Sequence, residues 1–142
     1  MKRTTWIAAV AGVALGFVVG TALDVVRAGK TIGVMLYMPF EQSAETAFAA
    51  YKTNDPRIAV WMLQHHLGRL DEFAKRGYPD SHRISAERFI THARLAKLYA
   101  AQGNSQEEQK QIELATSTGF MHASDKAMVY RIVSQFDSQE LP

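Results

Sequence analysis

The chain has 142 residues, of which 47% are hydrophobic and 21% are charged. This length and composition suit one domain with an appended segment, and they exclude a disordered or low-complexity chain. The sequence contains no cysteine. The absence of cysteine excludes a disulfide scaffold, a thiolate zinc site, thiol catalysis and a lipidated N-terminal cysteine.

The formal net charge of +2 arises within the first 27 residues, where Lys2, Arg3 and Arg27 face only Asp24. From Ala28 onward, basic and acidic residues are equal in number. A nucleic-acid-binding domain presents a basic surface, which this composition does not provide. We therefore expect no nucleic acid among the partners.

An uncharged segment, Thr4–Leu23, follows two basic residues. As a helix, a segment of this length spans about 30 Å, the thickness of a hydrocarbon core. A cleavable signal peptide is the alternative, because the small residues Gly20 and Ala22 suit a signal peptidase. The length of the apolar run, which continues past Asp24, favours an uncleaved transmembrane anchor over residues 1–27.

Small residues recur every four positions along one face of this predicted helix, at Ala8, Gly12, Gly16 and Gly20. Such a face lets a second transmembrane helix approach closely, so we predict that it packs against other membrane helices. The basic residues before the span favour a cytoplasmic N-terminus. Residues 28–142 then lie outside the cytoplasm, whether or not the N-terminus is cleaved.

A juxtamembrane connector is expected over residues 28–41. Its segment Thr31–Phe40 is almost wholly apolar but too short to cross a bilayer as a helix. Two interpretations are open. The segment lies at the membrane interface, or it packs on the domain that follows.

Beyond the connector, the sequence predicts helices over residues 42–53, 56–76, 85–102, 105–118 and 124–137, and no stretch alternates as a strand would. The expected start and stop signals are Asp55 before Pro56, a loop at Gly77–Asp80, Ser85, Gly103, a capping box from Ser105 to Glu108, Gly119 and Ser124. The predicted fold class is all-α, a single transmembrane helix followed by a small bundle of about five helices over residues 42–142.

The predicted helix at 56–76 is apolar on two sides. A core-facing stripe with helical spacing is formed by Val60, Leu63, Leu67, Leu70 and Ala74. Ile58, Trp61 and Met62 lie on the opposite side of its first half. The favoured interpretation is that neighbours from residues 31–53 cover these three side chains. Otherwise they form an exposed patch for a protein partner.

Part of the helical region resembles a tetratricopeptide repeat (TPR). Within the stretch Arg94–Ala115, the packing residues of that repeat are matched by Leu95, Ala96, Tyr99, Gly103, Ile112 and Ala115. Glu108 stands where the repeat usually has a small apolar residue. Asn54 and Asp55, followed by Ala59 and Leu63, resemble an earlier unit, so the resemblance covers residues 54–118. It implies a TPR-like stack of helical hairpins that binds other proteins or peptides.

Residues that could carry chemistry form no recognisable site. The five histidines are His65, His66, His82, His92 and His122, and none are four positions apart on one helix. His66 flanks the core stripe and is expected at the boundary of the core. The pairs Asp71-Glu72 and Glu107-Glu108 are expected on a solvated face and in a capping box. We therefore predict no catalytic, cofactor-binding or metal-binding residues and no cofactor.

These features together favour a single-pass membrane protein with a periplasmic or other extracytoplasmic helical domain. We expect it to be an accessory or assembly subunit of a membrane protein complex. It would contact other subunits through both its transmembrane helix and its helical domain. The alternative is a cleaved, soluble periplasmic or secreted helical protein that binds a small ligand. An enzyme is the third hypothesis.

Overall fold

The computed structural model describes residues 38–53, 55–121, 123 and 125–139. Its helices are residues 38–51 (helix 38–51), α2 (Pro56–Arg76), α3 (Ser81–Ala101), α4 (Ser105–Ser117) and α5 (Lys126–Gln139). These five helices and the absence of any strand from the described residues confirm the all-α class. Residues Pro39–Pro142 form one compact unit.

The predicted transmembrane anchor, with Ala8, Gly12, Gly16 and Gly20, lies outside the described residues. Among the helices that the structure does describe, none combines the length and the apolar character that a membrane crossing requires.

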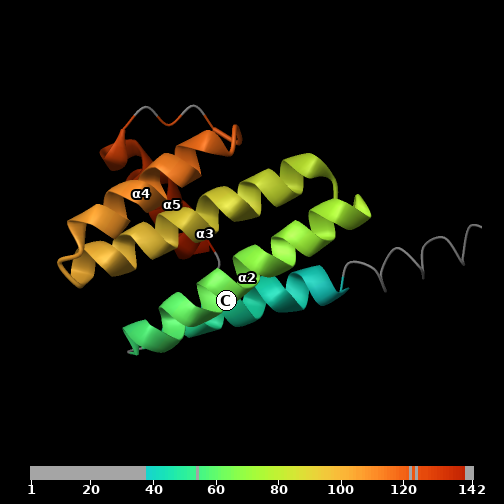
Figure 1. Ribbon diagram of the computed structural model, residues 1–142, viewed down its shortest axis with the longest axis horizontal. Helices are drawn as coiled ribbons and strands as arrows, with labels where there is room; N and C mark the ends of the chain where they lie inside the picture. The colour runs from blue at the N-terminus through green and yellow to red at the C-terminus, as the bar shows by residue number, and fades with distance from the viewer. Residues whose placement is uncertain (1–37, 54, 122, 124, 140–142) are drawn as a thin grey trace, which may run out of the picture. The chain divides into compact units, whose positions relative to one another are not determined.

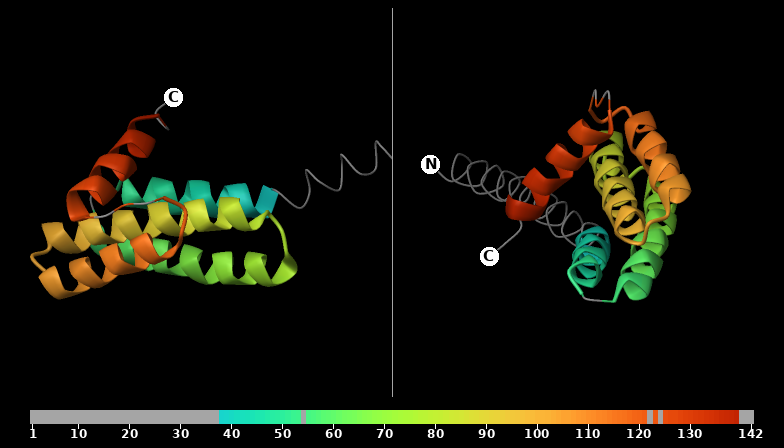
Figure 2. Two further views of the ribbon diagram at one scale, coloured as in Figure 1. Left: turned by 90° about the horizontal axis from the view of Figure 1, so that it is seen from above. Right: turned by 90° about the vertical axis from the view of Figure 1, so that its left-hand side faces the viewer.

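Helix α3 is the central element of the compact unit, since it contacts α2, α4 and α5. In Figure 1, helix 38–51 (cyan) runs along α2, and α3 and α4 continue the series with similar axis directions. Figure 2 shows that α5 (red) instead crosses its neighbours obliquely. Short loops between consecutive helices therefore produce a layered series of hairpins, which α5 closes on one side.

Several helix ends lie where the sequence placed them. Asp55 is the N-cap of α2 and accepts hydrogen bonds from the backbone N–H groups of Arg57 (2.9 Å) and Ile58 (3.3 Å). Gly103 and Gly119 follow α3 and α4 with φ values of 73° and 70°. A side chain is strained in this left-handed region, so glycine is the residue that ends a helix there most readily.

Two predicted caps are wrong by a few positions. α3 begins at Ser81 because the Asp80 side chain accepts from the Arg83 backbone N–H at 3.0 Å, so Ser85 lies inside the helix. Asn104, not Ser105, caps α4 and accepts from the Glu107 backbone N–H at 3.2 Å. In both cases an Asp or Asn stands earlier in the chain and caps at least as well as serine.

The first helix includes residues 38–41, which the sequence assigned to the connector. Phe40 is buried among Leu70, Phe73 and Ile84, with its ring 5.5 Å from that of Phe73. At its described end, the apolar segment Thr31–Phe40 thus packs on the domain, while residues 31–37 lie outside the description.

The buried face of α2 is rotated from the predicted stripe. Leu63 and Leu70 are fully buried as expected, and Val60 and Leu67 are half-buried. Ala74 is exposed, which corrects the prediction. The buried face is formed by Ala59, Leu63, His66, Leu70 and Phe73. The rotation arises because helix 38–51 and α3 cover α2 from two sides, so its buried sector includes the position of His66.

A buried ion pair joins the central helix to the last helix. Arg94 Nε donates to Asp137 Oδ1 at 2.9 Å, and both side chains are almost wholly buried. The Arg94 guanidinium also lies 4.3 Å from the centre of the Phe48 ring and 5.5 Å from that of Tyr51. One arginine of α3 therefore holds helix 38–51 and α5 together.

Glu108 lies in the interior between α4 and α5 and not in a capping box. The Tyr130 hydroxyl donates to Glu108 Oε1 at 2.5 Å, and Lys126 Nζ lies 2.5 Å from the same oxygen. These two donors lower the pKa of the Glu108 carboxyl group. A carboxylate thus fills the position where a TPR usually has a small apolar residue.

We expect acid to destabilise the fold through His92. Its Nδ1 lies 2.7 Å from Gln111 Oε1, and burial lowers the pKa of the imidazole from its ordinary 6.5. Above pH 6.5 the imidazole is neutral in both the folded and the unfolded state, so the protein keeps its full stability there. As the pH falls from 6.5 toward the lower pKa of the folded state, the unfolded state takes up the proton more readily, and the free energy of unfolding decreases. Urea unfolding at pH 7.5 and pH 5.5 should show a larger loss for the wild type than for His92→Gln. An equal loss in both proteins would contradict the assignment.

Candidate functional site

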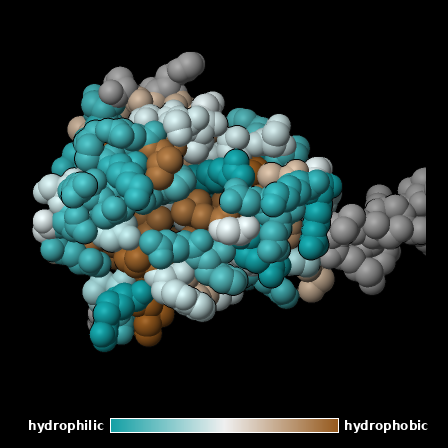
Figure 3. All heavy atoms as spheres, in the orientation of Figure 1, coloured by the Kyte–Doolittle hydropathy of each residue, from teal (hydrophilic) through white to brown (hydrophobic). Residues whose placement is uncertain are grey.

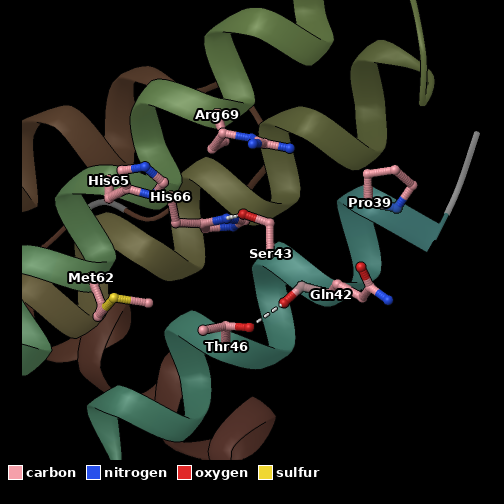
Figure 4. Close-up of a pocket in the computed structure, with 8 residues that line it drawn as sticks. All are labelled: Pro39, Gln42, Ser43, Thr46, Met62, His65, His66 and Arg69. Carbon is pink, nitrogen blue, oxygen red and sulfur yellow. Dashed lines mark hydrogen bonds between the residues drawn. The ribbon is translucent and has the colours of Figure 1, made fainter.

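A cleft of about 240 Å³ lies between helix 38–51 and α2 (Figure 4). Helix 38–51 contributes Pro39, Gln42, Ser43 and Thr46, and α2 contributes Met62, His65, His66 and Arg69. On each helix these residues are three or four positions apart, so each set occupies one helix face. No carboxylate lines the cleft.

His66 forms the inner wall of this cleft and is only 2% exposed, which corrects its predicted place at the boundary of the core. Its Nδ1 lies 2.8 Å from the Ser43 hydroxyl, and its Nε2 lies 3.5 Å from Glu87 Oε2 on α3. The Ser43–His66 contact is a hydrogen bond, whereas His66 Nε2 is buried and has no hydrogen-bond partner among the described residues. Glu87 therefore lies near Nε2 without being hydrogen-bonded to it.

The series of contacts from Ser43 through His66 to Glu87 resembles the Ser–His–acid triad of a hydrolase. The surroundings of these three residues do not support acyl transfer. Such chemistry needs hydrogen-bond donors that stabilise the developing oxyanion. Ser43 lies within a helix, where the backbone N–H groups bond to carbonyl groups of the same helix. The arrangement therefore supports an interhelical polar contact that fixes three helices, rather than catalysis.

Arg69 is the cation of the cleft. Its guanidinium lies 5.4 Å from the centre of the Phe73 ring, and its Nε lies 3.9 Å from Glu72 Oε2, which is too far for a hydrogen bond. This Nε is buried and has no hydrogen-bond acceptor among the described residues. Arg69 Nε and His66 Nε2 are thus two buried polar atoms of this cleft that lack a hydrogen-bond partner among the described residues, and each such atom is costly to the fold.

The predicted patch of Ile58, Trp61 and Met62 separates into two parts. Ile58 is 52% exposed and Trp61 is 61% exposed, so the structure does not bury them as the favoured interpretation expected. Met62 is half-buried and lines the cleft. The Trp61 ring stacks on the His65 ring with 5.6 Å between centres and 23° between planes. His65 therefore connects the two surfaces, because it stacks on Trp61 of the exposed pair and also lines the cleft.

The face of the molecule shown in Figure 3 is mainly polar. On the face shown in Figure 3, hydrophilic side chains predominate and apolar ones emerge only in separate areas between them. Other large apolar side chains with comparable or lower exposure among the described residues are Met38, Leu114 and Met121. Ile58 and Trp61 differ from Leu114 and Met121 because they are neighbours on one helix face.

Comparisons with protein-family models, curated proteins and solved structures give the same result. None of them matches this chain. The TPR resemblance therefore rests on the quoted residues alone. Within the described ranges, no group of three or more His, Asp and Glu side chains is placed to hold a metal ion.

Sequence reasoning did not anticipate the cleft, because it depends on which faces of two helices meet. One signal was present. Gln42, Ser43 and Thr46 place polar residues at helical spacing within a first helix that is otherwise rich in alanine and aromatic residues. His65 and Arg69 repeat that spacing on the helix that follows.

Proposed function

We propose that this chain is a membrane-anchored accessory or assembly subunit whose helical domain binds another protein. In this proposal, residues 1–27 are a single-pass anchor with a cytoplasmic N-terminus, and the helical domain is extracytoplasmic. Support for the anchor comes from the uncharged run Thr4–Leu23 and the charge before it. The stripe of Ala8, Gly12, Gly16 and Gly20 supports contact with other membrane helices.

The observation that carries the interaction proposal is the exposure of Trp61 beside Ile58. The two side chains are three positions apart on α2 and lie next to each other on its surface. Tryptophan is one of the residue types enriched among the side chains that dominate the binding energy of protein interfaces. An exposed tryptophan that its own domain leaves uncovered is therefore a good anchor for a partner protein.

Site-specific cross-linking tests this proposal in the full chain. A photoreactive amino acid is placed at Trp61, and the protein is irradiated in its native membrane. Leu114, exposed on α4, serves as the control position. We expect one discrete protein adduct from position 61 and none from position 114. No discrete adduct from position 61, or the same adduct from both positions, would contradict the proposal.

Alanine substitution then measures the energy of the contact. Truncating an interface hot spot costs about 2 kcal/mol or more, which is roughly a thirtyfold loss of affinity. We expect Trp61→Ala to release the adduct partner on a native gel in mild detergent, while Leu114→Ala retains it.

The soluble ligand-binding alternative is favoured by one observation, the polar cleft between helix 38–51 and α2. The intact mass of the natively expressed protein separates the two hypotheses. A full-length chain supports the anchor. A mature chain that begins near Leu23 would contradict it and favour the alternative.

A further inference from the structure

We propose that the cleft between helix 38–51 and α2 binds a small oxyanion, a carboxylate or phosphate group, through Arg69. This inference does not depend on a protein partner at Trp61 or on the membrane anchor. It rests on the charge of the cleft, on its two buried nitrogen atoms that have no hydrogen-bond partner among the described residues, and on its size.

The charge of the cleft favours an anion. Arg69 is its permanently charged residue, and two histidines are the only other titratable groups that line it. Two carboxylates lie near these residues, but neither lines the cleft. Glu87 faces His66 Nε2 from α3, and Glu72 is more than half exposed to solvent and not hydrogen-bonded to Arg69. Glu72 forms a long, solvent-exposed ion pair with Arg69 at 3.9 Å, and no carboxylate lines the cleft itself, so the lining carries the positive charge that an entering anion meets.

Two lining side chains are already used in internal hydrogen bonds. The Ser43 hydroxyl is paired with His66 Nδ1 at 2.8 Å, and Thr46 Oγ1 donates to the Gln42 backbone carbonyl oxygen at 2.6 Å. Two buried nitrogen atoms of lining residues, Arg69 Nε and His66 Nε2, have no hydrogen-bond partner among the described residues. The Gln42 amide and the His65 ring also line the cleft, so polar groups from both helices surround an anion bound through Arg69.

The guanidinium of Arg69 suits an oxyanion for a geometric reason. Its planar set of N–H donors matches two oxygens of a carboxylate or phosphate at once. The ring of Phe73 beneath it restricts the orientation of that plane.

The size and apolar part of the cleft limit the ligand. A volume of about 240 Å³ lies below the usual range for drug-sized ligands, which begins at roughly 300 Å³. Met62 and Pro39 supply apolar surface beside the donors. The ligand class is therefore an oxyanion with few other atoms, such as inorganic phosphate or a short-chain carboxylate.

Tryptophan fluorescence of the full chain in mild detergent provides the test. The chain has two tryptophans, and Trp6→Phe leaves Trp61 as the single emitter. Trp61 stacks on His65, so an anion that contacts His65 should change its emission. Phosphate and butyrate are titrated separately at constant ionic strength, because salt screens exposed charges. Butyramide is the uncharged control.

We expect a saturable change with phosphate, butyrate or both, with half-saturation on the order of 1 mM, and none with butyramide. Binding of butyrate alone identifies a carboxylate ligand, and binding of phosphate alone identifies a phosphate ligand. Saturable binding of neither anion, or equal binding of butyramide, would overturn the proposal.

Two variants locate the binding site. Arg69→Gln should weaken binding about tenfold or more, because a charge-assisted hydrogen bond is lost. Arg76→Gln, on the same helix but outside the cleft, should leave binding unchanged. Gln42→Ala, exposed on the other helix, should weaken binding about threefold and keeps the test decisive if Arg69→Gln does not fold. Equal affinity in Arg69→Gln and wild type, or equal weakening in Arg69→Gln and Arg76→Gln, would overturn the assignment.

Discussion

Replacing Asp137 with alanine should lower the free energy of unfolding by about 3 kcal/mol or more. Asp137 is the buried carboxylate to which Arg94 Nε donates, and Lys97 Nζ lies 3.5 Å from its second oxygen. Its removal leaves a buried guanidinium without that counter-charge. Such a loss is large against the total stability of a small domain, which is about 5–15 kcal/mol.

Urea unfolding followed by circular dichroism measures this effect. Asp71→Ala is the matched control, because Asp71 pairs with Arg88 at 2.5 Å on the surface. Exposed ion pairs contribute only about 0–1 kcal/mol, so we expect a much smaller change from the control. If both variants lost the same small amount of stability, Arg94 and Asp137 would not hold the first and last described helices together.

The second large effect is expected from Leu63→Ala, at about 2–5 kcal/mol of unfolding free energy. Leu63 is fully buried on α2 and packs with Ala47 of helix 38–51 and Leu95 of α3. Alanine leaves a cavity between three helices, and neighbouring backbones in a close-packed core cannot move far enough to fill it.

Leu114→Ala gives the comparison for this prediction, since Leu114 is exposed on α4 and loses the same atoms. We expect it to change the unfolding free energy by less than about 0.5 kcal/mol. Both variants are measured in the full chain under the same conditions. Similar losses in the two variants would show that the packing around Leu63 does not stabilise the domain.

The helices could be predicted from the sequence because their ends carry local signals. Asp55 with Pro56, and the glycines at 103 and 119, act through their own backbone conformation and need no distant partner. The two helix caps that were predicted wrongly, Ser85 and Ser105, also involve local signals. In each case an Asp or Asn that precedes the serine is the residue that caps the helix.

The candidate site was harder to predict because it depends on which helix faces meet. His66 lies on the boundary of the hydrophobic pattern of α2, yet the structure buries it between Ser43 and Glu87. A single helix cannot show that two neighbours will cover that position. Trp61 is the reverse case, since its apolar ring suggested burial, yet it is 61% exposed and stacks on His65 of its own helix.

The oblique crossing of α5 determines how far this architecture can extend. Val129, Ile132 and Val133 of α5 are buried against α3 and α4 in one continuous cluster. In a hairpin array, each unit must leave an apolar face on which the next one can stack. Here α5 occupies that face with its own side chains. A further hairpin therefore could not stack on that same face of α3 and α4 while α5 is in place.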